Sequence, residues 1–515
     1  GAPSTLRFRL PVIDKNGNFV AGGVTSRVRK QRGDLPIRKI GPDEVALTSY
    51  YSKLFVHRAE RMVFNFEAWL CNQITSRGIN DEDTTVTELR FGKPFTNDIR
   101  LPRHYTILAK TFLGFRSGDY TFDFNWNKRE EVFGTDLVKL VDTRPELVLC
   151  GHHGKLPIVM DMESKLYTVT VEGKKLLLKP IHDILSIVGI ERSKAPVEIA
   201  EVGIFAKAIP VGFVLAYITG LGDLLETLKV PYRRVKTRSH YQMDDDEFDV
   251  RFEDETLVFK RTHLAMMIFG GFNRYHRDIK RISIYAFDKK DVYSSVLANN
   301  NIGVRSLKEM DLMFKLWVDH ITEEILVEMG EPTDLFNLFI SAVKKLEYDD
   351  HPDIMDNRFM RDKGYERFAG IAYTEMVKAM RVYAGKPQND KATVDLNPEA
   401  VWHTILGDAT VMQVEDSNPI GNLQEKEVIV YRGEGGRSAR SMTVKTRGYH
   451  KSSLGVVSEA GVDKGDVGTV IYTSADPSYK SVRGLINPVE KVDGNNNARI
   501  LSTSTLMGPW TTTDD

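Results

Sequence analysis

One stretch near the C-terminal end, residues 415–468, limits most strongly what this chain can form. It carries Y-R-G-E-G-G-R-S-A-R at residues 431–440 and T-R-G-Y-H-K at residues 446–451, so that arginines flank a turn rich in glycine. Glycine adopts positive φ angles and lets two backbones approach closely. Arginine can bind a phosphate group through two hydrogen bonds. Residue chemistry alone therefore predicts a loop that contacts anions.

The charges of the chain are balanced, which limits how it can meet nucleic acid. Its 515 residues include 70 Lys or Arg and 71 Asp or Glu, for a formal net charge of −1. Any contact with nucleic acid must therefore be a local patch or be shared with partner chains. The only two cysteines are Cys71 and Cys150, which excludes a disulfide framework and is typical of a reducing compartment.

The length of the chain predicts about three domains, at roughly 150 residues each. Its most apolar run, residues 208–225, is interrupted by Pro210, three glycines and Asp223. Because that run is too short and too broken to span a bilayer, we expect a buried helix or strand there. No signal peptide is recognisable, and the first residue, Gly1, predicts a natural start further upstream, removed by a protease or by cloning.

Local patterns near the N-terminus predict a strand pair and then a helix. Residues 6–24 favour a hairpin with its turn at Asn16-Gly17, a strong hairpin signal. Apolar residues recur at helical spacing over residues 42–78, with proline at the start and glycine at the end. The basic segment 27–38 between them is open to two interpretations, a solvated loop or an edge that faces nucleic acid.

The rest of the chain mixes strand-like and helical runs, which predicts an α+β fold with one inserted domain between about residues 112 and 330. Strands are expected at 166–171, 175–180, 256–261 and 282–287, and helices at 181–190, 221–228, 307–329, 335–346 and 366–383. A polar connector is expected at residues 386–397. The tail after Pro488 is poor in core-forming residues, so we expect it to be loosely ordered unless a partner holds it.

Neither of two polar clusters has the spacing of a metal site. His152-His153 follow Cys150, but no second pair of Cys or His follows at a matching distance. Residues 244–247 are four consecutive acids, whereas metal-binding carboxylates usually alternate along a strand or come from separate elements. The sequence therefore predicts a solvated acidic loop and no metal site, and it also lacks the G-x-x-x-x-G-K-[ST] phosphate-binding loop.

Three separated stretches, in this order, resemble the second-largest subunit of multisubunit DNA-dependent RNA polymerases, the β subunit of bacteria. L-P-V-I-D-K-N-G-N-F-V-A-G-G-V-T-S-R-V at residues 10–28 is similar to the family's E-I-P-L-M segment, and D-D-H-P-D-I-M-D-N-R-F-M-R-D-K-G at residues 349–364 to its D-D-I-D-H-L-G-N-R-R segment. In the third stretch, Asn418-Pro419, residues 433–436 and R-x-x-H at 447–450 resemble N-N-P, G-P-G-G and R-D-V-H. Since the family's C-terminal half is missing, the chain resembles the N-terminal half of a split β-like subunit from a jumbo-phage polymerase.

The resemblance implies an architecture and a role. It implies an α+β, multidomain chain with a protrusion (1–110 and 335–410), a lobe-like insertion (111–334) and a fork with a C-terminal tail (411–515). Such a chain forms one wall of the DNA/RNA cleft and is inactive alone. It has no catalytic residue, because the Mg²⁺ ions of the assembled enzyme are held by aspartates of a separate β′-like chain; the absence of a D-x-D-x-D pattern here agrees with that.

The resemblance also implies which residues act. The nucleic-acid contacts are expected at Arg432, Arg437, Arg440, Arg447, His450 and Lys451. The glycines that shape the fork are expected at Gly433, Gly435, Gly436, Gly455, Gly465 and Gly468. The alternative for His450, Arg440 and the glycines is a purely structural role. Residues 423–428 depart from the family's basic H-K-R-R run, which predicts an enzyme that resists rifampicin.

The expected partners are a β C-terminal-half-like subunit, β′-like subunits, template DNA and the RNA transcript, with a phage-specific promoter-recognition subunit as a further candidate and no membrane. The expected location is the cytoplasm of the infected bacterium, with the virion as an alternative. A second hypothesis is a phage structural or injected nucleic-acid-binding protein that reuses the fold without transcription. The missing aspartates exclude a single-chain RNA polymerase.

Overall fold

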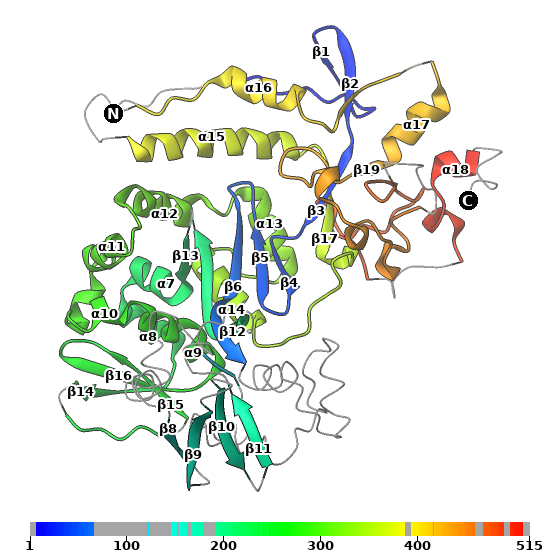
Figure 1. Cartoon of the computed structure of the whole chain (residues 1–515). Coiled ribbons are helices and arrows are strands. Elements are labelled where there is room, and N and C mark those ends of the chain that lie inside the picture. The colour runs from blue at the N-terminus through cyan, green and yellow to red at the C-terminus, as the bar shows by residue number, and fades with distance from the viewer. Residues whose placement is uncertain are drawn as a thin grey trace. The chain divides into compact units, whose positions relative to one another are not determined.

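The computed structural model divides by its internal contacts into two units, residues 1–58 with 198–515 and residues 59–197. It describes residues 7–65, 121–123, 146–151, 154–161, 166–171, 174–178, 192–204, 207–237, 239–244, 246–386, 393–415, 417–458, 467–488 and 495–507 (Figure 1). Several sheets and many helices alternate along the chain, so the prediction of a mixed α+β fold is confirmed. The boundaries expected for a protrusion, a lobe and a fork remain predictions.

The smaller unit, residues 59–197, contains an antiparallel sheet with the strand order β11-β10-β9-β8. Its strands are β8 (Glu146–Gly151), β9 (Gly154–Asp161), β10 (Leu166–Val171) and β11 (Lys174–Leu178). Strands were predicted at 166–171 and 175–180, and both are confirmed. The predicted helix at 181–190 and the pair His152-His153 lie outside the described residues.

A second sheet has the strand order β13-β12-β6-β5-β4, with the short strand β7 paired to β6. Its strands are β4 (Ile37–Gly41), β5 (Glu44–Thr48), β6 (Lys53–Asn65), β7 (Thr121–Asp123), β12 (Arg192–Ile204) and β13 (Lys207–Pro210). The helix predicted over residues 42–78 is therefore wrong up to Asn65, and the remainder lies outside the described residues. Leu54 and Val56 are buried while Phe55 is 37% exposed, which is the two-residue period of a strand.

The apolar run 208–225 is buried, as predicted. It ends β13 and then forms the helices α7 (Val211–Thr219) and α8 (Leu221–Leu228). A Cβ atom on Gly212 would lie 2.1 Å from the carbonyl oxygen of Ile268, so only glycine lets α7 approach helix α9 (His263–Phe269) this closely. Within the described part of the chain, no single helix is long and apolar enough to cross a membrane. Helices α7 and α8 together have sufficient length and apolar composition, but the pair is bent by 111°.

The larger unit has further helices, of which the sequence predicted only those in the regions 307–329, 335–346 and 366–383. They are α10 (His276–Ile279), α11 (Lys290–Asn299), α12 (Val304–Leu316), α13 (His320–Met329), α14 (Leu335–Lys345), α15 (Arg367–Gly385), α16 (Pro398–Leu406), α17 (Pro419–Glu427) and α18 (Thr503–Met507). The expected helix 307–329 is interrupted because Asp319 caps α13 through the backbone N–H of Thr322. The expected strand 282–287 is instead a 3-10 helix, Ile284–Asp288.

Two smaller sheets complete this unit. One has the order β14-β16-β15, with β14 (Tyr232–Lys236), β15 (Glu247–Arg251) and β16 (Glu255–Lys260), and confirms the strand expected at 256–261. The other joins β1 (Asn18–Ala21), β2 (Val24–Val28) and β18 (Val411–Gln413). The N-terminal hairpin thus turns at Gly22-Gly23, with φ of 58° and 80°, rather than at Asn16-Gly17. Two successive positive φ angles give the turn whose twist matches paired strands.

The sheet that positions the candidate site has the order β17-β3-β19-β20. Its strands are β3 (Lys30–Asp34), β17 (Met360–Lys363), β19 (Val428–Val430) and β20 (Val470–Tyr472). β3 pairs antiparallel with β17 and parallel with β19. Figure 1 shows these strands, which come from both ends of the chain, side by side. This sheet therefore brings together segments close to all three stretches selected from the sequence.

The exposure expected of the basic segment is wrong, and the described part of the tail, residues 495–507, makes packing contacts. In the basic segment 27–38, Arg27, Arg32 and Arg38 are buried, so it is neither a solvated loop nor an edge open to nucleic acid. In the tail, the helix α18 packs against α17, and the buried Glu427 carboxylate accepts the backbone N–H groups of Thr503 and Ser504. Pairing explains both results, because a buried charge is stable when a partner neutralises it or donates hydrogen bonds to it.

Candidate nucleic-acid interface

A buried ion pair links the strand that follows the first selected stretch to the second selected stretch. Arg32 on β3 donates from Nε and Nη2 to the two carboxylate oxygens of Asp362 on β17, at 2.8 and 2.9 Å. Its Nη1 donates to Oδ1 of Asn357 at 2.8 Å, and the Tyr479 hydroxyl donates to Asp362 at 2.6 Å. Burial, followed by the Asp362 carboxylate, raises the pKa of Tyr479. The two-pronged geometry satisfies charges that would otherwise be costly to remove from water.

Asn357 also connects this pair to the third stretch. Its backbone N–H donates to Ser452 Oγ at 2.8 Å, and its side-chain amide donates to Ser453 Oγ at 2.6 Å. His450 Nδ1 lies 2.7 Å from Ser452 Oγ and accepts the Ser452 backbone N–H at 3.2 Å. Because Nδ1 accepts that N–H, we assign the ring proton to Nε2. His450 thereby caps the 3-10 helix Lys451–Ser453.

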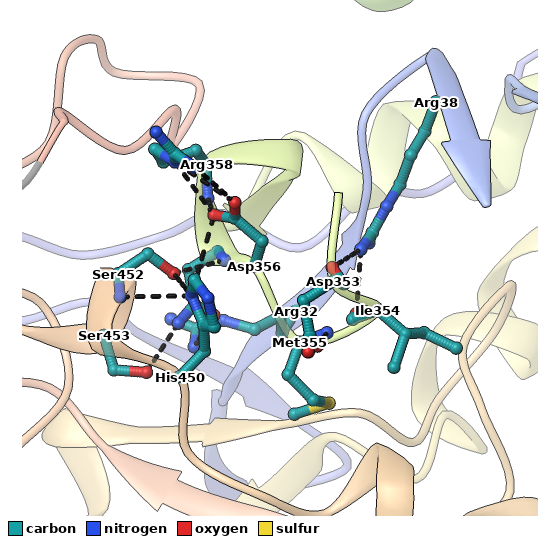
Figure 2. Close-up of polar contacts among 11 residues, drawn as sticks. Arg32, Arg38, Asp353, Ile354, Met355, Asp356, Arg358, His450, Ser452 and Ser453 are labelled. Carbon is teal, nitrogen blue, oxygen red and sulfur yellow. Dashed lines mark hydrogen bonds and ion pairs between the residues drawn. The ribbon is translucent and has the colours of Figure 1, made fainter. Parts of the chain in front are cut away.

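Two neighbouring contacts of the 349–364 stretch fix its backbone. Arg358 donates from Nε and Nη2 to the Asp356 carboxylate, at 3.0 and 2.7 Å to its two oxygens. Burial acts to raise the pKa of Asp356, but hydrogen bonds from Arg358 outweigh it, and the net change is a lowered pKa. Arg38 Nη2 donates to the carbonyl oxygens of Asp353 and Ile354, at 2.9 and 2.8 Å (Figure 2). This stretch is therefore held by Arg358, which lies within it, and by Arg38, which lies outside it.

A second cluster joins the glycine-rich turn to the same sheet. Asp34 accepts from Arg38 at 2.8 Å, from Lys53 at 3.0 Å and from Arg437 at 3.1 Å. Burial acts to raise the pKa of Asp34, but these cations prevail and lower it to about 2. The Arg437 guanidinium also lies 5.9 Å from the centre of the Tyr431 ring. Arg437 therefore links the turn to β3.

The glycines of the turn are required by its backbone. Gly433 and Gly435 have φ of 112° and 70°, and a Cβ atom on Gly436 would lie 2.2 Å from the Tyr431 carbonyl oxygen. The backbone N–H of Glu434 donates to Asp408, and Nη2 of the buried Arg367 lies 3.0 Å from both carboxylate oxygens of Asp408 and donates to them. Gly455 and Gly468 likewise have positive φ, 84° and 68°, while Gly465 lies outside the described residues. The conformation of the turn is thus fixed by its glycines and by the hydrogen bond to Asp408.

The predicted contact residues separate into two groups. Arg432, Arg440 and Lys451 are exposed. Arg437, Arg447 and His450 are only partly exposed and make internal hydrogen bonds; Arg447 Nε, for example, donates to the Met442 carbonyl oxygen at 3.1 Å. The structure adds two exposed residues that the resemblance did not indicate, Lys445 and Tyr449, the latter 57% exposed.

We call the exposed residues Arg432, Arg440, Lys445, Tyr449 and Lys451 the basic rim. Residues 431–453 contain six Lys or Arg, at 432, 437, 440, 445, 447 and 451, against a single acid, Glu434. In a chain whose charges balance overall, this local excess is the kind of patch that binds phosphates. An exposed tyrosine among such cations offers a surface on which a base can stack.

The carboxylates near the rim do not form a metal site. Asp34, Asp356, Asp362 and Asp408 each accept hydrogen bonds from an arginine. Among the described residues, no group of three or more His, Cys, Asp or Glu is arranged to hold a metal ion. At residues 244–247, Glu247 is buried and paired with Arg233. The described residues therefore do not fit a Mg²⁺ ion, and we assign them no metal-dependent step.

Comparison with known protein families gives one match. A family model described as bacteriophage RNA polymerase matches residues 1–439, which is most of the chain. No curated protein matches the chain. The prediction of a split β-like subunit is therefore wrong, because the matched family is that of the single-subunit bacteriophage enzyme. The argument against a single-chain polymerase from the missing D-x-D-x-D pattern is overturned by the same match.

Physical reasons explain the error. Several matching positions are glycines at positive φ, such as Gly17, Gly433 and Gly468, and Arg358 and Arg361 are paired with acids. Many unrelated loops attached to a sheet require such residues. Catalytic carboxylates can also come from separate elements, so a missing linear motif does not exclude them. The expected β- and β′-like partners, the promoter-recognition subunit and the structural or injected protein gain no support, whereas template DNA and RNA remain expected partners of an RNA polymerase. The expectation of rifampicin resistance loses its basis with the β-like subunit.

Proposed function

Because the chain belongs to the bacteriophage RNA polymerase family, we propose that its basic rim holds nucleic acid during DNA-directed RNA synthesis. The rim contacts backbone phosphates, which positions the template or the transcript without reading its sequence. Tyr449 adds a stacking surface for an unpaired base. The proposed place of action is the cytoplasm of the infected bacterium, where template and nucleotides are both present.

One observation supports this proposal most directly. The exposed cations belong to a segment whose backbone is fixed by hydrogen bonds to the rest of the fold. Asp408 holds the turn at Glu434, and Ser452 and Ser453 hold the residues next to Lys451 through Asn357. A backbone that is already fixed loses little conformational freedom on binding, so more of the electrostatic attraction contributes to affinity. The cation side chains themselves remain exposed to solvent.

Polymerases generally use a pair of metal ions to stabilise the attacking and leaving oxygens. The part of this role that the described residues can perform is to bind, orient and retain the nucleic acid. Arg437 and His450 contribute indirectly, because they fix the backbone that carries the exposed cations.

The test is a variant with Arg432→Ala, Arg440→Ala, Lys445→Ala and Lys451→Ala. Four lost phosphate contacts should weaken duplex binding and make the slope of log affinity against log salt shallower by about 3 to 4. Fluorescence anisotropy with labelled duplex and single-stranded DNA measures affinity at several salt concentrations. Elongation on a primed template should weaken most at raised salt.

A matched control removes as many charges elsewhere in the same unit. Arg277, Lys280, Arg281 and Lys289 are exposed, so their replacement by alanine changes the net charge by the same amount. The control should retain the salt slope of the wild type. Equal slopes for both variants, or wild-type elongation by the rim variant at raised salt, would disprove the assignment of the rim.

A further inference from the structure

A small cavity is lined in part by the glycine-rich turn, through Glu434 and Gly435, and by none of the exposed cations of the rim. Its volume is about 210 Å³. It is walled by the turn Ser49–Ser52, by β17 through Arg361 and Lys363, by α13 and α15, and by Gly435. Four cationic side chains line it against two acidic ones: Lys53, Arg361, Lys363 and Arg367 against Asp34 and Glu434.

Lys363 is the unusual member of this lining. It is 8% exposed, yet none of the described residues accepts a hydrogen bond from its amine or pairs with it as an ion. Its amine lies 5.5 Å from the centre of the Tyr50 ring. A Cβ atom on Gly33 would lie 2.7 Å from Lys363 Cε, so the lysine stem crosses a glycine that leaves it room. A buried ammonium normally requires an ionic or hydrogen-bonding partner.

The other cations of the cavity already have partners. Arg361 donates to Glu366 at 2.7 Å, Arg367 donates to Asp408 at 3.0 Å, and Lys53 donates to Asp34 at 3.0 Å. Burial, followed by the positive charges of Arg361 and Arg367, lowers the pKa of Lys363 to about 7. The site therefore contains an amine without a hydrogen-bonding or ion-pair partner, close to two fixed positive charges, while Asp34 and Glu366 act on it only at longer range.

Two hydroxyl groups in the same lining are also unsatisfied. Thr48 Oγ1 and Ser52 Oγ are buried and have no hydrogen-bond partner among the described residues. A buried hydroxyl without a partner costs free energy, and such groups are uncommon in folded proteins. An unpaired amine and two unpaired hydroxyls at one cavity are together the donor set of an oxyanion site.

We infer that this cavity binds a small phosphate-class anion, inorganic phosphate or pyrophosphate, through the Lys363 amine and the hydroxyls of Thr48 and Ser52. The volume is below the range usual for drug-sized ligands, which favours these small anions over a whole nucleotide. The inference is independent of nucleic-acid binding by the rim, because the two sites share no residue.

Isothermal titration calorimetry at constant ionic strength and pH 7.5 tests the inference, with pyrophosphate, phosphate and sulfate as separate ligands. The wild type should bind pyrophosphate or phosphate with one site per chain, and the stronger of the two identifies the preferred anion. Lys363→Met should abolish binding, and Thr48→Val, which removes one hydroxyl while keeping the shape, should weaken it about three- to tenfold. Lys289→Met, at an exposed lysine, should leave binding unchanged.

The protonation of Lys363 gives a second readout. The groups that face its amine are Arg361, Arg367, Asp34, Glu366 and Tyr50. A bound anion favours the charged amine, so binding near pH 7.5 should take up a proton and weaken as the pH rises further. The heat of binding should then vary with the ionisation enthalpy of the buffer.

Three results would overturn the inference. They are no binding by the wild type at millimolar anion, wild-type affinity in both Lys363→Met and Thr48→Val, or a heat independent of the buffer. If Lys363→Met does not fold, the affinity of Thr48→Val and the buffer dependence of the heat still test the inference. The rim variant should bind pyrophosphate like the wild type, so a failure of the rim proposal and a failure of this one give different results.

Discussion

Two sets of arginines in this protein have the same chemistry and opposite surroundings. Arg32, Arg361 and Arg367 are buried, and each forms hydrogen bonds to a carboxylate. Arg432 and Arg440 stand on a turn that is attached to the same sheet, but they are exposed. Buried arginines fix the backbone, while exposed ones are free to meet a ligand. The position of an arginine relative to the sheet, more than the local density of charge, decides which role it can have.

The largest effect should follow from breaking the most buried pair. Arg32→Met leaves the Asp362 carboxylate buried without its cation, so the free energy of unfolding should fall by about 3 to 5 kcal/mol. Urea denaturation followed by circular dichroism measures it. In the double variant Arg32→Met with Asp362→Leu, much of the loss should be recovered, because no unpaired charge remains. An equal loss in the double variant would show that packing, rather than the charge, is responsible.

The Asp34 cluster should give a smaller effect that depends on pH. The folded-state pKa of Asp34 is lowered from 3.8 to about 2, a difference equivalent to about 2 kcal/mol. A lowered pKa stabilises the fold above the unfolded value and ceases to do so as the pH falls through the folded value. Asp34→Asn should therefore be less stable than the wild type above pH 4, and the gap should close towards pH 2. A gap that is constant over this range would exclude ionisation of Asp34 as its cause.

The sequence predicts different parts of this molecule with different success. Helices α8, α14 and α15 were predicted nearly to their ends, because their apolar residues have helical spacing and local signals mark their termini. β6 was mistaken for helix, since tertiary pairing with β5 prevails over an ambiguous apolar pattern.

The candidate site shows the same limit. The sequence indicates which loop is rich in arginine and glycine, and it selected the stretches that β3, β17 and β19 bring together. It does not indicate that Arg437 faces Asp34, which is 403 positions away. Nor does it indicate that Lys363 and Thr48 line one cavity. Such contacts depend on the register of paired strands, and no short motif encodes that register.

The smallest effects on stability should distinguish Arg437 from Arg440, although the sequence predicts the same nucleic-acid contact for both. Arg437→Ala removes a partly buried hydrogen bond to Asp34 and a contact with Tyr431, so the free energy of unfolding should fall by about 1 kcal/mol. Arg440 is exposed, and Arg440→Ala should change stability by less than about 0.5 kcal/mol.

Binding of DNA should show the opposite order. Arg440→Ala should weaken affinity and make the salt slope shallower by about 1, while Arg437→Ala should leave the slope nearly unchanged. Urea denaturation and anisotropy on the same two preparations measure both quantities. If Arg437→Ala alters the salt slope as much as Arg440→Ala does, the division between buried ties and an exposed rim is wrong, and Arg437 leaves Asp34 to contact the nucleic acid.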